Sequence, residues 1–128
     1  MNFIDWFTVV TMLICFGQTA NANETACGEK RNAKMALRLT LSNIDHLGTS
    51  SSTSTGIYQP FTNIHCSDGA CSFALDSSVI RKYEPDHVHA SADGFVSYPN
   101  IDLMTEMKNA ITASRRYESA AKACSEDI

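Results

Sequence analysis

The stretch that decides the fold reads ADGFVSYPNI at residues 92–101 and continues as DLMTEMKNAITASRRYESAAKAC at residues 102–124. In its second part, apolar and small residues return every three or four positions, which is the spacing of one helix face. Asn100 and Asp102 stand before this run, and either side chain can cap the free amides of a helix. We therefore predict a helix over residues 101–125. Its contact seam would be Leu103, Met107, Ala110, Ser114, Tyr117, Ala121 and Cys124.

A second helical pattern lies upstream, over residues 24–46, and Gly48 follows it as a stop signal. An antiparallel arrangement that sets Cys27 opposite Cys124 brings the apolar positions of both helices together. It places Leu37 opposite Ser114, Leu41 opposite Ala110 and Ile44 opposite Met107. Small residues along the seam would allow the two helices to approach closely at coiled-coil spacing.

Residues 49–98 lie between the two helical patterns and have a different character. The Ser/Thr-rich start, residues 49–56, is typical of a solvated loop. Short β-like runs follow at residues 57–65, 71–75 and 79–83, and an Asp-Gly turn separates the first two. The predicted fold class is therefore mainly α with a small β element. The N- and C-terminal helices would pair as an antiparallel coiled-coil hairpin, with a short β-hairpin region between them.

The first residues are typical of a targeting segment. An apolar run of roughly 15 residues, shorter than the about 20 that span a bilayer, precedes Ala20-Asn21-Ala22, an A-x-A cleavage pattern. We predict a signal peptide over residues 1–22 and a single mature domain over residues 23–128. An uncleaved anchor and an ordinary buried helix remain alternatives, and Ile14 disfavours a lipoprotein site at Cys15.

Export would place four cysteines in an oxidising compartment, where four thiols allow two disulfides in three connectivities. Cys66 and Cys71 flank the Asp-Gly turn, so a bridge between them fits a hairpin. Cys27 and Cys124 lie at matching ends of the two predicted helices, and we favour a second bridge there. The alternative is a pair of unrelated free thiols.

Composition excludes several classes of function. A net charge of −4 in 128 residues offers no basic footprint for nucleic acid. His87-Val88-His89 could suggest a metal site, but a polar loop is the simpler interpretation, and no cofactor or small-molecule substrate is expected. The chain has no nucleophile elbow and no redox Cys-x-x-Cys pattern, so we do not expect an enzyme.

Several ordered motifs resemble a known family. Glu84-Pro85-Asp86-His87, the stretch 92–101, Glu106-Met107 and the stretch 113–118 resemble, in order, the carboxy-terminal signature of the FlgC family of flagellar proximal rod proteins. The residues that carry this resemblance are Pro85, His87, Gly94, Phe95, Pro99, Asn100, Glu106, Met107, Ser114, Arg115 and Tyr117. The signal-like segment and the cysteines depart from the family pattern.

The resemblance implies a structural subunit of the flagellar basal-body rod that contributes to motility. Such a subunit would pack helically with other rod and axial proteins and with copies of itself, in a basal body that crosses the periplasmic space. The alternative is an exported periplasmic interaction module that binds a flagellar or envelope protein without polymerising.

The predicted leader can be tested by sequencing the amino terminus of the protein recovered from fractionated cells. We expect a periplasmic chain that begins at Asn23, because cleavage follows the A-x-A pattern. An intact Met1 would contradict the signal peptide.

Overall fold

The structure, a computed structural model, describes residues 3–125, with side chains from Ala22 onward. Within these residues, two helices and four strands follow one another. Their bounds are α1 (Phe3–Asp45), β1 (Phe61–Ser67), β2 (Ala70–Leu75), β3 (Val79–Tyr83), β4 (Phe95–Pro99) and α2 (Leu103–Ala123).

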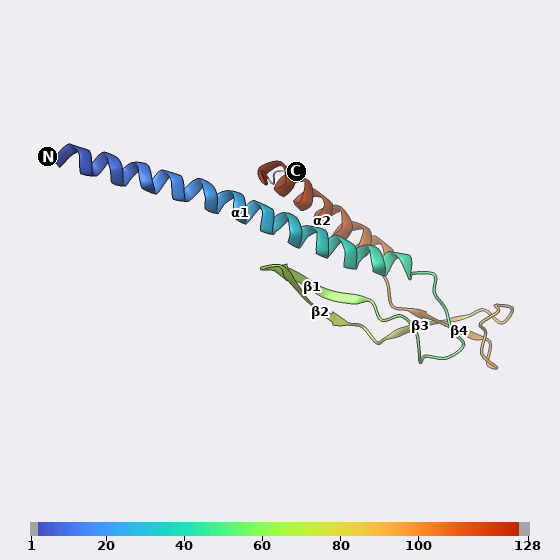
Figure 1. Cartoon of the computed structure of the whole chain (residues 1–128). Coiled ribbons are helices and arrows are strands. Elements are labelled where there is room, and N and C mark those ends of the chain that lie inside the picture. The colour runs from blue at the N-terminus through green and yellow to red at the C-terminus, as the bar shows by residue number, and fades with distance from the viewer. Residues whose placement is uncertain (1–2, 126–128) are drawn as a thin grey trace.

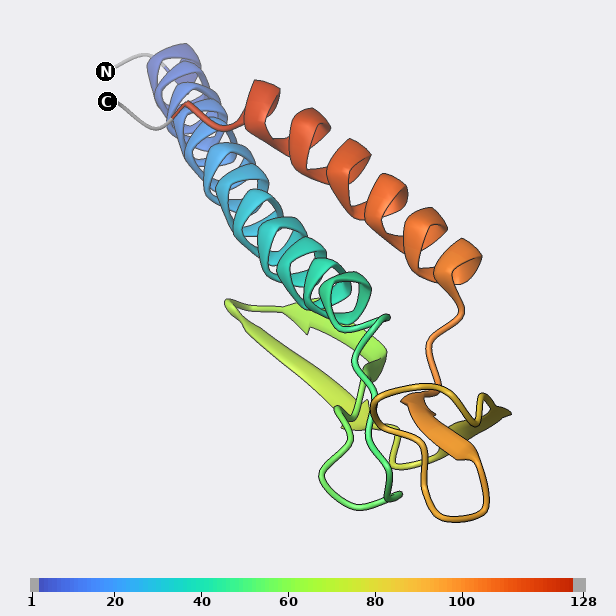
Figure 2. The same cartoon turned by 90° about the vertical axis from the view of Figure 1, so that its right-hand side faces the viewer.

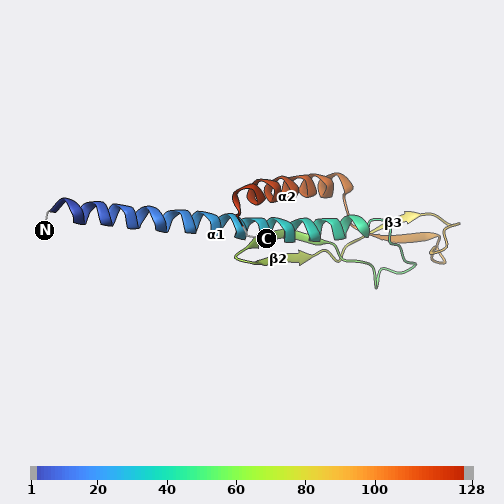
Figure 3. The same ribbon diagram turned by 45° about the horizontal axis from the view of Figure 1, so that its top comes forward.

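Helix α1 is the central element of the molecule. It contacts α2 on one side and the β1–β2 hairpin on another (Figures 1 and 2). The β3–β4 hairpin lies beyond the C-terminal end of α1, between the loop that leaves α1 and the start of α2 (Figure 1). The N-terminal half of α1 extends well past the end of α2 (Figure 3).

The predicted fold class was wrong. The four strands form two separate antiparallel sheets, β1–β2 and β3–β4, rather than one short hairpin region. The sequence predicts no strand immediately before α2, yet Phe95–Pro99 is a strand that pairs with β3 over its full length. The helices also differ too much in length, 43 residues against 21, for a matched coiled-coil hairpin.

The helix boundaries differ from the predictions mainly at the amino terminus. Helix α1 runs without a break through Ala22 and Asn23, where the predicted leader would end. Met1 and Asn2 lie outside the described residues. Asp102, rather than Asn100, caps α2: its side chain accepts a hydrogen bond from the Met104 amide at 3.3 Å. Within the described part of the chain, no helix is both long and apolar enough to cross a membrane.

Asn43 on α1 is fully buried and joins three parts of the fold. Its side chain donates to the Phe61 carbonyl at 2.9 Å and accepts from the Phe61 amide at 2.9 Å, so it pairs with β1 as a neighbouring strand would. The same oxygen accepts from the Tyr58 hydroxyl at 3.0 Å, and the amide group also bonds the Glu106 carboxylate on α2. A buried amide needs all of these partners, because each one left unmade would cost free energy.

Two disulfides close loops of very different length. Cys27 and Cys124 join α1 to the end of α2, with a Cα–Cα distance of 4.8 Å and a sequence separation of 97. Cys66 and Cys71 are directly opposite each other in the β1–β2 ladder. Next to the first bridge, the Asn23 side-chain oxygen accepts a hydrogen bond from the Ser125 amide at 2.8 Å. The end of α2 is therefore fixed to α1 both covalently and by hydrogen bonding.

Loop length predicts which disulfide matters more for stability. In the chain-entropy model, losing the long-range bridge by Cys27→Ser with Cys124→Ser should cost about 4.7 kcal/mol, against about 2 kcal/mol for Cys66→Ser with Cys71→Ser. Chemical denaturation of both double variants measures the difference. Equal losses, or a larger loss for the hairpin pair, would contradict it.

Candidate assembly surface

Small side chains line the contact between the two helices. Ala113 and Ala120 of α2 and Ala33 of α1 are buried, with exposures of 5%, 7% and 0%. These three residues carry only methyl groups, so the helix backbones can approach closely. An ion pair between Arg116 and Glu29 lies near the disulfide end of this contact, where both side chains are partly exposed. Such a pair adds little to stability and mainly fixes the register of the helices.

The predicted seam lies to one side of the observed contact. Leu103, Met107 and Leu41 are 38%, 46% and 46% exposed, so a large part of each side chain faces solvent. The remaining predicted seam residues are half-buried at the margin: Leu37, Ile44, Ala110, Ser114, Tyr117, Ala121 and Cys124. The centre of the contact on α2 is instead formed by Glu106, Ala113 and Ala120, which recur at intervals of seven residues.

Displacement of the seam leaves large apolar side chains exposed on the helices. Ile111 and Met104 are 51% and 74% exposed, and Leu103, Met107 and Ile111 recur every four residues along one flank of α2. The disulfide and the ion pair fix the register so that Leu41 of α1 lies at the level of this flank. Apolar residues grouped in this way mark interaction sites in soluble proteins. We call Leu41, Leu103, Met104, Met107 and Ile111 the helical apolar face.

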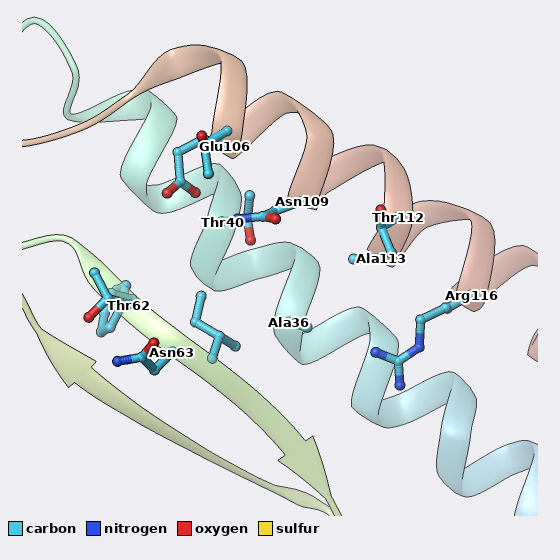
Figure 4. Close-up of a pocket in the computed structure, with 12 residues that line it drawn as sticks. Ala36, Thr40, Thr62, Asn63, Glu106, Asn109, Thr112, Ala113 and Arg116 are labelled. Carbon is cyan, nitrogen blue, oxygen red and sulfur yellow. The ribbon is translucent and has the colours of Figure 1, made fainter.

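A groove of about 430 Å³ lies on the other flank of α2, where β1 and α2 both meet α1 (Figure 4). Ala36 and Thr40 of α1 form its floor, and Thr62 and Asn63 of β1 form one wall. Asn63 has a positive φ of 51° at a point where the β1–β2 register shifts. The other wall comes from α2 and comprises Thr105, Glu106, Asn109, Thr112, Ala113 and Arg116.

Glu106 is the acidic residue of this groove, and it belongs to the motif that carries the family resemblance. One of its carboxylate oxygens is buried without a hydrogen-bond partner. Burial raises the pKa of the Glu106 carboxyl, and the nearby negative charge of Asp102 acts in the same direction, whereas the hydrogen bond from Asn43 opposes them. The ionised form is therefore disfavoured in the folded protein.

The motif residues upstream of α2 hold the β3–β4 hairpin in shape. Gly94 has a positive φ of 81°, and a Cβ atom there would lie 2.6 Å from the ring of Tyr83. Any other residue would be strained in conformation and would collide with that ring. Phe95 begins β4 and contacts Tyr83 edge to face, with ring centroids 5.4 Å apart. The conformation and this contact together explain the Gly-Phe pair of the motif.

Pro99 and Asn100 connect the hairpin to α2. Pro99 ends β4 and is fully buried, while the Asn100 side chain donates to Asp76 at 3.1 Å and to Ser78 at 3.0 Å. These bonds tie the start of α2 to the segment between β2 and β3. The pKa of the Asp76 carboxyl lies below its usual value, chiefly because of hydrogen bonds from Ser78, with a smaller contribution from Asn100.

The loop between β3 and β4 carries the rest of the upstream motif. The His87 amide donates to the Glu84 carbonyl at 3.0 Å across Pro85, so these residues form a turn. His87 and His89 lie with ring centroids 5.6 Å apart, and His89 bonds the hydroxyl of Ser50. Within the described residues, no three His, Cys, Asp or Glu side chains are grouped as metal ligands. The loop geometry is that of a polar turn.

The sequence did not indicate that two polar residues, Asn43 and Glu106, face inward, although Glu106 was identified as a motif residue. Asn43 and Glu106 occupy helix positions that hydrophobic periodicity assigns to solvent, because both are polar. The spacing of Glu106, Ala113 and Ala120 was nevertheless readable as a heptad of small residues interrupted by one carboxylate. The exposed Arg115 of the motif makes no ion pair within the described chain.

Glu106 should make the stability of the protein depend on pH. The pKa of this carboxyl is higher in the folded than in the unfolded protein. Such a group stabilises the folded state at low pH, and this contribution is lost as the pH rises through the raised pKa. The variant Glu106→Gln lacks this ionisable group and does not lose stability in this way. Its stability relative to the wild type should therefore increase as the pH rises from 4 to 7. Thermal unfolding at both pH values measures the change, and Glu118→Gln on the exposed face is the control. A pH-independent difference would contradict the assignment.

Comparison with known proteins agrees with the motif. A family model described as flagellar basal body rod FlgEFG protein C-terminal matches residues 92–126. The flagellar basal-body rod protein FlgC of Salmonella typhimurium is 46% identical over 37 residues, which are 29% of this chain and 28% of that protein. FlgC of Escherichia coli matches with the same identity and coverage.

The chain therefore covers 28% of the length of these relatives. The match to the family model lies in β4, α2 and the segment just before them. This family consists of structural rod components and not of enzymes. The matched residues include Gly94, Pro99 and Glu106, each of which has a defined structural role in the present fold. Residues 92–126 are therefore similar to the C-terminal part of flagellar basal-body rod proteins.

Proposed function

We propose that this protein is a structural subunit of the proximal rod of the flagellar basal body and that it contributes to motility by packing with other axial proteins and with copies of itself. The single observation that carries the proposal is the helical apolar face, which leaves Leu103, Met107 and Ile111 exposed within the family-matched helix. In an isolated monomer, this stripe of large apolar side chains is exposed to water. In an assembly, a neighbouring subunit would bury it.

The proposed mode of assembly is heterologous, with different surfaces of one copy meeting in the next. A rod grows because such contacts do not close on themselves. The small-residue contact between α1 and α2 keeps the pair narrow, which allows close packing around an axis.

We also propose that the protein is exported and becomes oxidised in the periplasmic space. The two disulfides support this location, because such bonds persist in oxidising compartments and are rare in the bacterial cytosol. In this proposal, residues 1–22 direct export and residues 23–128 form the mature domain. The same disulfides favour a second candidate function, a periplasmic interaction module that binds a rod or envelope protein without polymerising.

The helical apolar face can be tested in a deletion strain complemented with variants. Met107→Lys with Ile111→Lys should abolish swimming, because the lysines would bury charge in the contact with a neighbour. Both positions are about half exposed, so the stability of the monomer should change by about 0.5 kcal/mol or less. Swimming in soft agar and recovery of the protein in purified basal bodies are the measurements.

Ser119→Lys, an exposed substitution outside the apolar face, is the matched control and should leave swimming unchanged. Normal motility of the deletion strain, with the protein found as a soluble periplasmic monomer, would refute the rod role and favour the interaction module. Normal motility of the lysine variant alone would show that assembly uses another surface.

A further inference from the structure

The two small sheets have four outer strand edges, and two of these edges are covered. The Asn43 side chain forms hydrogen bonds with both the N–H and the C=O of Phe61, and these bonds cover the outer edge of β1 at that residue. Ser51 exchanges two backbone hydrogen bonds with Ser97, at 3.0 and 2.8 Å, which covers the outer edge of β4. Within residues 22–125, the outer edges of β2 and β3 have no such cover.

The ladder pattern identifies the peptide groups that β2 leaves open. The Asp76 amide donates to the Pro60 carbonyl at 3.0 Å, so Leu75, one residue earlier, turns its N–H and C=O away from β1. The same alternation turns Phe73 and Cys71 outward. The register shift lies in β1 and leaves the alternation along β2 unchanged.

The same reasoning applies to β3. The Glu84 amide donates to the Gly94 carbonyl at 2.9 Å, so the peptide groups of Tyr83, Arg81 and Val79 point away from β4. Each open edge therefore presents the outward groups of three residues. An open edge of this kind is a template for pairing with another strand.

Exposed apolar side chains accompany both open edges. On β2, Phe73 and Leu75 are 46% and 53% exposed, and on β3, Ile80 and Tyr83 are 38% and 66% exposed. Strand β2 also contains no charged residue and no proline, which are the usual devices that protect an edge. In β3, Arg81 is engaged by Asp93 and by the Phe95 ring of its own hairpin.

We propose that β2 of one copy pairs with β3 of the next copy, so that the two hairpins join into one four-stranded sheet across the subunit boundary. The inference rests on the proposed function, because it supposes that copies of the chain assemble. A two-stranded sheet is marginally stable alone, and four strands would satisfy the backbone groups that both edges leave open. The contact is heterologous and can therefore repeat along an axis.

Charge distinguishes this pairing from the symmetric ones. Pairing of β3 with β3 would set Arg81 and Lys82 of two copies close together, and like charges across a ladder are unfavourable. Pairing of β2 with β2 would close a dimer and leave both β3 edges open. In the heterologous pairing, Asp68 and Asp76 at the two ends of β2 meet the basic strand β3.

Proline variants of the full-length oxidised chain test the pairing, because proline at an outward position removes one edge donor and keeps the internal ladder. Leu75→Pro blocks β2, with Leu75→Ala as its matched control, and Val79→Pro blocks β3, with Val79→Ala as its control. Sedimentation velocity over a range of concentrations measures association. Circular dichroism and titration of free thiols verify that each variant is folded and oxidised.

We expect the wild type and both alanine controls to form a series of oligomers, and each proline variant alone to remain monomeric. An equimolar mixture of the two proline variants should form dimers and nothing larger, since each copy then keeps one working edge. This mixing result is specific to a heterologous β2–β3 contact.

Three outcomes would overturn the inference. Self-association of Val79→Pro at the wild-type level, with loss in Leu75→Pro, would indicate β2–β2 dimers. Wild-type assembly of both proline variants would assign association to the helical apolar face and leave the proposed rod function intact. A wild type that stays monomeric at all concentrations would exclude self-pairing, while the motility assay would still decide the rod role separately.

Discussion

The fold depends on one saturated hydrogen-bonding group, the side-chain amide of Asn43. It lies where α1, β1 and α2 meet, and its two donors and two acceptor positions are occupied by Phe61, Tyr58 and Glu106. The sheets contribute few large side chains to a common core. The hydrogen bonds of this amide therefore supply part of the stabilisation that apolar burial supplies in a larger domain. A residue that cannot both donate and accept would leave β1 without its neighbour on α1.

The arrangement around Asn43 also accounts for the division of surfaces on α2. The helix faces α1 with alanines and a single carboxylate, so it approaches closely but buries little apolar area there. Its larger side chains, among them Met107 and Ile111, therefore remain exposed on the surface of the monomer. Disulfides suit such a molecule, because loop closure stabilises it without requiring further core residues.

The sequence was sufficient for some of these features and not for others. Helix α2 and its capping region were predictable, because three- and four-residue periodicity and an Asp cap are local signals. Strand β4 was not, since Gly94 and Pro99 resemble turn residues until a partner strand is present. The exact contact face of α2 was displaced because periodicity ranks large apolar residues first, whereas close helix approach selects small ones. Glu106 could not be recognised as inward-facing without its partner Asn43.

The long-range disulfide has a mechanical consequence. A tensile load that pulls the end of α2 away from α1 is carried across the sulfur–sulfur bond of Cys27 and Cys124. Everything between these two residues, including both hairpins and the Asn43 cluster, lies outside that load path. The covalent bond therefore shields the weak hydrogen-bonded elements from such a load, and they can shift without lengthening the molecule.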